Sequence, residues 1–185
     1  MLQGNPKGIE REIKMKKIMQ ICAITLVAAT AIFAANNPMV GGHEMFPSKN
    51  IVQNALNSDD HTTLVAAVKA AGLVDTLEGP GPFTVFAPTN EAFAKLPAGT
   101  VNTLLMAENK ATLTKILTYH VIAGQKMNAQ QLADAGMAKT VEGGTVTIAK
   151  AGDTININGQ TAVVCGNVQT ANATVQIIDT VLMPS

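Results

Sequence analysis

Apolar residues in the first half of the chain recur at the three- and four-residue spacing that is typical of amphipathic helices. One such stripe covers residues 51–56. A longer stripe runs from Leu64 to Ala71 and is followed by Gly72, a residue type that is common just after a helix. Shorter helices are predicted further along, at residues 90–96, 100–105, 110–117 and 129–135.

The second half of the chain instead shows short runs in which apolar and polar residues alternate, the pattern of strands with one buried face. Residues 79–82, Gly-Pro-Gly-Pro, form a hard break, and Asn158-Gly159 strongly favours a tight β-hairpin. Strands are predicted at residues 83–87, 120–123, 145–149, 154–157, 160–165 and 174–182. Because helices come mainly first and strands later, the pattern predicts an α+β domain rather than an alternating α/β one.

The N-terminal region has the pattern of a secretory signal peptide. The positive charge is at Met15-Lys16-Lys17, and the apolar run of residues 18–33 follows. Ala34 and Ala35 are the small residues after which we expect cleavage. Cleavage would make the protein secreted or periplasmic, with no stable membrane span.

Two alternatives remain for the residues before this signal. Met15 is the true start, or Met1–Lys14 is a real extension and the apolar run stays as an anchor near the minimum length for a membrane span. Residues 36–48 are rich in Pro, Gly and Met without periodicity, which predicts a flexible leader. Residues 49–185 form the folded domain, and we expect residues 1–35 to contribute nothing to its stability.

Composition excludes several classes of protein. The 185 residues are 47% hydrophobic, which argues against global disorder, and their formal net charge of +0 gives no indication of nucleic-acid binding. Cleavage would remove five of the 13 Lys/Arg and two of the 13 Asp/Glu residues, which leaves a charge near −3. It would also leave Cys165 as the only cysteine, so we expect a small buried residue with an inert thiol and no internal disulfide.

No sequence motif indicates catalysis or a cofactor. The dinucleotide, phosphate-loop and Gly-x-Ser-x-Gly motifs are absent. His43-Glu44 begins like a zinc-binding helix, but Pro47 stands where the second His is needed. Met39, His43 and Met45 could offer soft ligands to copper, although incidental methionines in a leader are the simpler interpretation. We therefore predict no enzymatic activity, no cofactor and no metal.

Four polar residues are predicted to fasten the fold. Asp179 shares strand parity with apolar neighbours, so we expect it to face the core and accept hydrogen bonds there, since bare burial of a carboxylate is costly. His120 lies between a predicted helix and a predicted strand, where we expect a hydrogen-bonded clip. Thr89 and Asn90 can cap the helix that follows them, and one of them could also reach His120.

Three segments resemble the signature blocks of the fasciclin domain family. They are GPFTVFAPTNEAFAKLP at residues 81–97, LTYHVIAG at residues 117–124, and VQTANATVQIIDTVLMP at residues 168–184. A further segment at residues 64–77, LVAAVKAAGLVDTL, is similar to bacterial members, so the resemblance spans Lys49 to Pro184. The last block departs from the family twice. Ala173 replaces the usual Gly after Asn172, and Gln176 stands where His is common.

The resemblance implies a wedge in which a β-sandwich of about seven strands is flanked by several helices. It also implies a bacterial envelope module that mediates adhesion to a cell-surface or matrix protein or polysaccharide. In animal members the Tyr-His block has been linked to integrin-type receptors. The corresponding candidate adhesive motif here is Ile116, Leu117, Tyr119, His120, Val121 and Ile122, unless these residues belong to the core. The alternative function is an envelope carrier of a small apolar ligand or metal.

Overall fold

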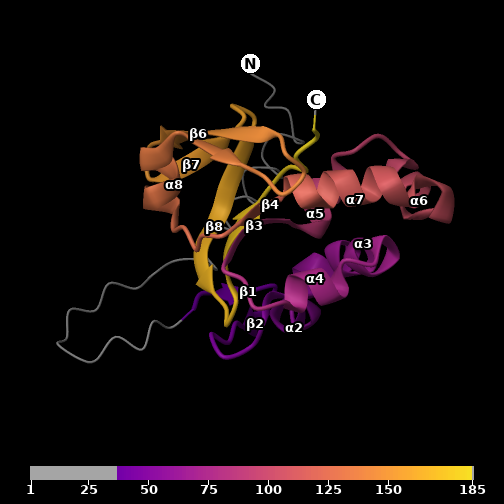
Figure 1. Ribbon diagram of the computed structural model, residues 1–185, viewed down its shortest axis with the longest axis horizontal. Coiled ribbons are helices and arrows are strands. Elements are labelled where there is room, and N and C mark those ends of the chain that lie inside the picture. The colour runs from indigo at the N-terminus through magenta and orange to yellow at the C-terminus, as the bar shows by residue number, and fades with distance from the viewer. Residues whose placement is uncertain (1–36, 185) are drawn as a thin grey trace, which may run out of the picture.

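A computed structural model describes residues 37–184 and shows a helical layer beside a strongly bent sheet (Figure 1). The predicted signal peptide and upstream extension lie outside the described residues. The helices are α2 (Ile51–Leu56), α3 (Thr62–Ala71), α4 (Val74–Glu78), α5 (Asn90–Ala94), α6 (Thr100–Leu105), α7 (Lys110–Tyr119) and α8 (Ala129–Ala135). The strands are β1 (Met39–Val40), β2 (His43–Glu44), β3 (Phe83–Pro88), β4 (Val121–Ala123), β5 (Met137–Lys139), β6 (Thr145–Ala151), β7 (Thr154–Ile157), β8 (Thr161–Gln169) and β9 (Ala173–Ile178).

Seven strands form one sheet in the order β4-β3-β9-β8-β7-β6-β5. β3 and β9 run parallel, whereas the other neighbours are antiparallel. The sheet curls until its two edges almost meet. Just beyond β5, the backbone N–H of Val141 donates to the Val121 carbonyl of β4 at 2.8 Å. The α+β class and the seven strands expected from the resemblance are confirmed.

The central strands β3 and β9 are buried on both faces. Val85 and Ile177 point toward the helices and share a core with Leu64, Val68 and other residues of α2, α3 and α7. The opposite face carries Phe86 and Ile178, and it packs against residues of β6 and β7 within the curl. This double burial explains why the central strands are almost continuously buried, whereas β6 alternates buried and exposed positions at its start.

Local signals account for most of the turns. α3 ends at Gly72 in the left-handed conformation, with φ of 73°. The Asn158-Gly159 turn has φ of 52° and 71° and joins β7 to β8, so the predicted hairpin is confirmed. At Gly81, with φ of 56°, an added Cβ would overlap the Asn172 carbonyl oxygen, so only glycine fits there. The short helix α4 was not predicted.

The segment predicted as a flexible leader is packed against the domain, so that expectation is wrong for residues 37–48. β1 and β2 form a small antiparallel hairpin, and both Val40 and Met45 are buried. Asn37 binds the backbone of Gln169 on β8 through both its amide oxygen and its amide nitrogen. The hairpin therefore has two apolar anchors and a polar one, which composition alone does not reveal.

Cys165 lies buried on β8, as predicted. It is disulfide-bonded in the full chain, whereas the expectation of no internal disulfide concerns the chain after signal cleavage and stays a prediction.

Candidate functional site

The candidate adhesive motif lies where α7 ends and β4 begins, and it is part of the core. The side chains of the motif are between 2 and 7% exposed, namely Ile116, Leu117, Tyr119, His120, Val121 and Ile122. The apolar stripe of α7 packs on the helical side, while Tyr119 and Ile122 belong to the core inside the curled sheet. The motif therefore offers no exposed contact patch, and the core interpretation is the one that the burial supports.

His120 ties the end of α7 to the C-terminal segment. Its Nδ1 donates to the Ile116 carbonyl at 2.8 Å, and its Nε2 accepts from the backbone N–H of Leu182 at 2.9 Å. Because Nε2 must carry a lone pair to accept this bond, the imidazole is neutral. Burial lowers the pKa of His120 to about 4, and the bond to the Ile116 carbonyl opposes the shift only in part. The side chain is thus a neutral clip between two segments 62 residues apart in sequence.

Tyr119 makes a second link from the same helix end. Its hydroxyl donates to the Thr145 carbonyl of β6 at 3.1 Å and accepts from the Asn158 side-chain amide at 3.2 Å. The helix end is therefore bonded both to β6 and to the β7–β8 turn. Sequence reasoning identified Tyr119 only through the family motif and gave it no bonding role.

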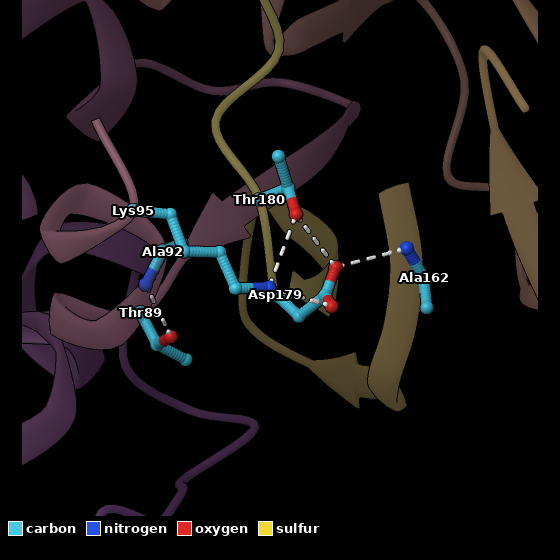
Figure 2. Close-up of polar contacts among 6 residues, drawn as sticks. All are labelled: Thr89, Ala92, Lys95, Ala162, Asp179 and Thr180. Atoms are coloured by element: carbon cyan, nitrogen blue, oxygen red, sulfur yellow. Dashed lines mark hydrogen bonds and ion pairs between the residues drawn. The ribbon is translucent and has the colours of Figure 1, made fainter. Parts of the chain in front are cut away.

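Asp179 lies one residue beyond β9, and its side chain is 31% exposed (Figure 2). Its Oδ1 accepts from the Ala162 backbone N–H at 3.0 Å and from the neighbouring Thr180 hydroxyl at 3.1 Å. Its Oδ2 pairs with the Lys95 ammonium at 2.9 Å. The amide and hydroxyl donors expected for Asp179 are present, but the expected core position is wrong. The prediction assumed a strand through residue 182, but β9 ends at Ile178, so the alternation of inward and outward side chains does not extend to Asp179.

Thr89 and Asn90 lie at the start of α5. The Thr89 hydroxyl accepts from the Ala92 backbone N–H at 3.2 Å, which is an N-terminal cap (Figure 2). The Asn90 side chain accepts from the Thr63 backbone N–H at 3.0 Å and donates to the Asp59 carbonyl at 2.9 Å, so it joins α5 to the start of α3. His120 is bonded to Ile116 and Leu182 instead, and the contact with Thr89 or Asn90 that seemed available from sequence is not made.

The Asp179→Ala variant is expected to lower the free energy of unfolding by about 1–2 kcal/mol, because the Ala162 N–H loses its acceptor while the half-exposed ion pair contributes little. The control is Lys95→Ala, which removes the ion pair and keeps the amide bond and should cost less than about 0.5 kcal/mol. Urea denaturation of both variants makes the comparison. Equal losses would show that the ion pair, and not the amide bond, is the fastener.

One of the two departures from the family pattern, Gln176, lies in a buried polar network. Gln176 is fully buried, accepts from the Asn167 backbone N–H at 3.1 Å and donates to the Asn167 side chain at 3.2 Å. Asn167 in turn accepts from the Ala129 N–H at the start of α8 at 2.7 Å. The glutamine in place of the common histidine therefore supports β8 where its register with β9 shifts, between Cys165 and Val168, and through Asn167 it supports the start of α8.

Asn172 is another polar fastener that sequence reasoning missed. Its side-chain amide donates to the carbonyls of Leu77 and Gly79 at 2.7 and 2.8 Å, and its oxygen accepts from the Ile51 backbone N–H at 3.2 Å. One buried side chain thus closes the C-terminal end of α4 and the N-terminal end of α2. Its partners lie more than 90 residues away in sequence, so no local pattern announces them.

The residues considered for copper are divided between surface and core. His43 is exposed and lies 3.3 Å from Asp59, whereas Met45 is buried. The β1–β2 register sets exposed Met39 opposite Glu44. Within residues 37–184, no group of three His, Cys, Asp or Glu side chains could hold a metal ion.

A family model, the fasciclin domain, matches residues 59–184, and the chain belongs to this family. Relatives support the assignment over most of the chain. Protein sll1483 of Synechocystis is 42% identical over 178 residues, which cover 88% of this chain and 97% of the relative. Immunogenic protein MPB70 of Mycobacterium bovis is 45% identical over 163 residues, which cover 83% of this chain and 79% of the relative. Cell surface glycolipoprotein MPB83 of the same species is 43% identical over 160 residues, covering 83% and 70%.

A solved structure shares the fold. It is a FAS1 domain pair from the insect cell adhesion molecule fasciclin I, with a TM-score of 0.67 and 16% sequence identity. The alignment covers 74% of this chain and 51% of that one, so this chain matches about half of the pair. In the described residues, no helix has the length and apolar character needed to cross a membrane.

Proposed function

We propose that this protein is a non-enzymatic adhesion or interaction module of the bacterial envelope, secreted or periplasmic after removal of a signal peptide that ends at Ala34 or Ala35. Its partner would be a cell-surface or extracellular protein or polysaccharide. The observation that carries the proposal is the 43% identity to a cell surface glycolipoprotein over 83% of this chain. Buried polar residues of the signature blocks, such as His120 and Gln176, make structural hydrogen bonds within the fold, which supports a role without catalysis.

The buried signature block cannot itself touch a partner, so the contact surface must lie outside it. Val141 and Met183 flank the block and are 46 and 50% exposed. The backbone N–H of Val141 donates a hydrogen bond to the carbonyl of Val121. Met183 follows Leu182, whose backbone N–H donates a hydrogen bond to His120. The core motif therefore holds in place two segments that each present a large apolar side chain to solvent. We assign the adhesive contact to these two side chains.

The double substitution Val141→Glu with Met183→Glu is expected to reduce binding to intact bacterial cells at least tenfold without changing the melting temperature by more than a few degrees. Exposed apolar side chains at a contact are replaced by hydrated charges that resist burial there. The control is Leu56→Glu, because Leu56 is 56% exposed on α2, at the opposite end of the molecule from the C-terminus (Figure 1).

Binding is measured by flow cytometry of fluorescent protein on cells, and a glycan array identifies polysaccharide partners. Retained binding by the double variant, or an equal loss in Leu56→Glu, would contradict the assigned surface. Failure of the wild-type protein to bind any cell or glycan would contradict the adhesion function itself.

A further inference from the structure

The domain ends in a short segment, residues 180–184, that follows β9 and belongs to no helix or strand. Among the residues that the structure describes, Leu182 makes the only backbone hydrogen bond of this segment, from its N–H to His120 Nε2 at 2.9 Å. Thr180 is bonded to Asp179 and Lys95 through its side chain (Figure 2). Beyond Thr180, His120 is therefore the one polar clasp on the segment.

Two apolar side chains complete the attachment of the segment. Val181 is buried in the core on the helical side, and Leu182 is buried in the core inside the curled sheet. Met183 comes next, and it is one of the two exposed side chains assigned to the adhesive contact. The position of Met183 thus depends on a stretch that forms no regular structure and is held by Val181, Leu182 and His120.

His120 can hold Leu182 only while its imidazole is neutral. Its Nδ1 donates to the Ile116 carbonyl, so Nε2 is the nitrogen that carries the lone pair. A proton on Nε2 would set two donors against each other and would place a positive charge on a side chain that is 2% exposed. Both penalties end if the segment moves away and water reaches the imidazole. Protonation of His120 and attachment of the segment therefore oppose each other.

No neighbouring charge makes the protonated form of His120 easier to accommodate. β3 and β4 lie beside it and carry no titratable side chain. The pocket next to His120 has one charged residue in its walls, Lys69 of α3, whose positive charge would oppose protonation. The charged side chains at the base of the segment and on the last two turns of α7 are in ion pairs, namely Asp179 with Lys95 and Lys115 with Glu142. Burial therefore lowers the pKa of His120 to about 4, opposed only by the Ile116 carbonyl.

From the single clasp, the opposed donors and the position of Met183, we propose that residues 180–184 are an acid-released latch on the contact surface. At neutral pH, His120 holds the segment and Met183 is in place to bind. In acid, His120 takes up a proton, the segment detaches, and the contact is lost while the rest of the domain stays folded. The consequence for binding rests on the proposed adhesion function, whereas the opening of the latch is a property of the fold alone.

The opening is tested by hydrogen exchange of the Leu182 backbone amide in the ¹⁵N-labelled full chain. Release lets His120 titrate near its ordinary pKa of 6.5 instead of about 4, so the ratio of released to attached segment should rise about 20-fold from pH 7 to pH 5. The protection factor of Leu182, corrected for the intrinsic effect of pH on exchange, should fall by the same factor. Local release exposes little surface, so low urea should leave this exchange unchanged while it accelerates exchange of the Ile177 amide in β9.

Two variants separate the latch from other effects of acid. In His120→Gln the glutamine oxygen can accept from Leu182 and does not titrate, so the Leu182 protection factor should stay constant from pH 7 to pH 5. The matched control His61→Gln removes the other buried imidazole and should keep the 20-fold fall. If His120→Gln does not fold, the wild type still decides. The fall in Leu182 protection must then level off at the pH at which the ¹⁵N resonance of His120 Nε2 titrates.

Flow cytometry on intact cells between pH 7 and pH 4 tests the consequence for binding. The affinity of the wild type and of His61→Gln should fall in acid by the factor that the released fraction sets, and that of His120→Gln should not follow it. A constant Leu182 protection factor in the wild type, or an equal fall in His120→Gln, would overturn the latch even if cells are bound. Failure of the wild type to bind cells at pH 7 would contradict the adhesion function, while a 20-fold fall in Leu182 protection would still support the opening of the latch.

Discussion

The Asn172→Ala variant is expected to lose about 3–4 kcal/mol of its free energy of unfolding. The substitution leaves the carbonyls of Leu77 and Gly79 and the backbone N–H of Ile51 without their side-chain partner. Each buried group deprived of its hydrogen bond costs about 1 kcal/mol or more, and water cannot readily replace the amide at this site. A loss of this size is a large fraction of the stability of a small domain.

Urea denaturation at pH 7 measures this effect. The matched control is Asn156→Ala on β7, an asparagine that is half-buried and lies away from the Asn172 network. We expect it to cost less than about 1 kcal/mol. Asn172→Asp adds a further check, because it keeps the shape but sets a carboxylate against two carbonyls and should be at least as damaging as alanine. Losses of similar size in Asn156→Ala and Asn172→Ala would contradict the central role of Asn172.

The second large effect is a loss of stability as the pH falls, and it comes from His120. The pKa of His120 is lowered to about 4 in the folded protein from the ordinary value of 6.5. The unfolded chain therefore binds this proton more readily, so the stabilisation is complete above pH 6.5 and declines as the pH falls toward 4. Between pH 7 and pH 5 the contribution lost is about 2 kcal/mol. Protonation of Nε2 would also remove the acceptor that holds the Leu182 N–H.

The His120→Gln variant isolates this contribution. Glutamine does not titrate, and its side-chain oxygen can accept from Leu182 in place of Nε2. The difference in unfolding free energy between wild type and variant should therefore shrink by about 2 kcal/mol when the pH is lowered from 7 to 5. The pKa of His61 is also lowered by burial. Because His61 is present in both proteins, its contribution to the unfolding free energy cancels in the difference. A difference that does not change with pH would show that His120 is not a buried neutral clip.

The elements that could be predicted from sequence are those with local causes. The stripe from Leu64 to Ala71 and its glycine end predict α3 closely, and Asn158-Gly159 predicts the β7–β8 hairpin. The fasciclin resemblance supplied the seven-strand architecture. α4 escaped prediction because the residue before it, Leu73, makes no side-chain cap, whereas the equally short α5 follows the capping residue Thr89.

The contacts that could not be predicted join distant parts of the chain. Asn37 binds Gln169, and Asn172 binds residues that lie 93 to 121 positions earlier. Neither asparagine has a local pattern that distinguishes it from one in an exposed turn. The hairpin at residues 39–44 was predicted to be a flexible leader, because its burial depends on residues of β8, β9 and α2 that are distant in sequence.

The candidate adhesive motif shows the limit of transferring a family role to individual residues. Tyr119 and His120 match the family block in sequence, yet both are buried and bonded to β6 and to the C-terminal segment. A substitution in such a block can abolish adhesion by loosening the segments that it holds, without ever touching the partner. Loss of binding alone therefore does not identify a contact residue, and stability must be measured beside it.

The central claim is that the Tyr-His block is an internal fastener and that the exposed residues beside it make the contact. The most direct test is to measure, side by side at pH 7, the cell binding of wild type, His120→Gln and the Val141→Glu, Met183→Glu double variant, each first shown to be folded by circular dichroism. The account predicts that folded His120→Gln binds cells like the wild type, whereas the double variant loses at least tenfold in binding. Loss of binding by folded His120→Gln, with full binding by the double variant, would contradict it.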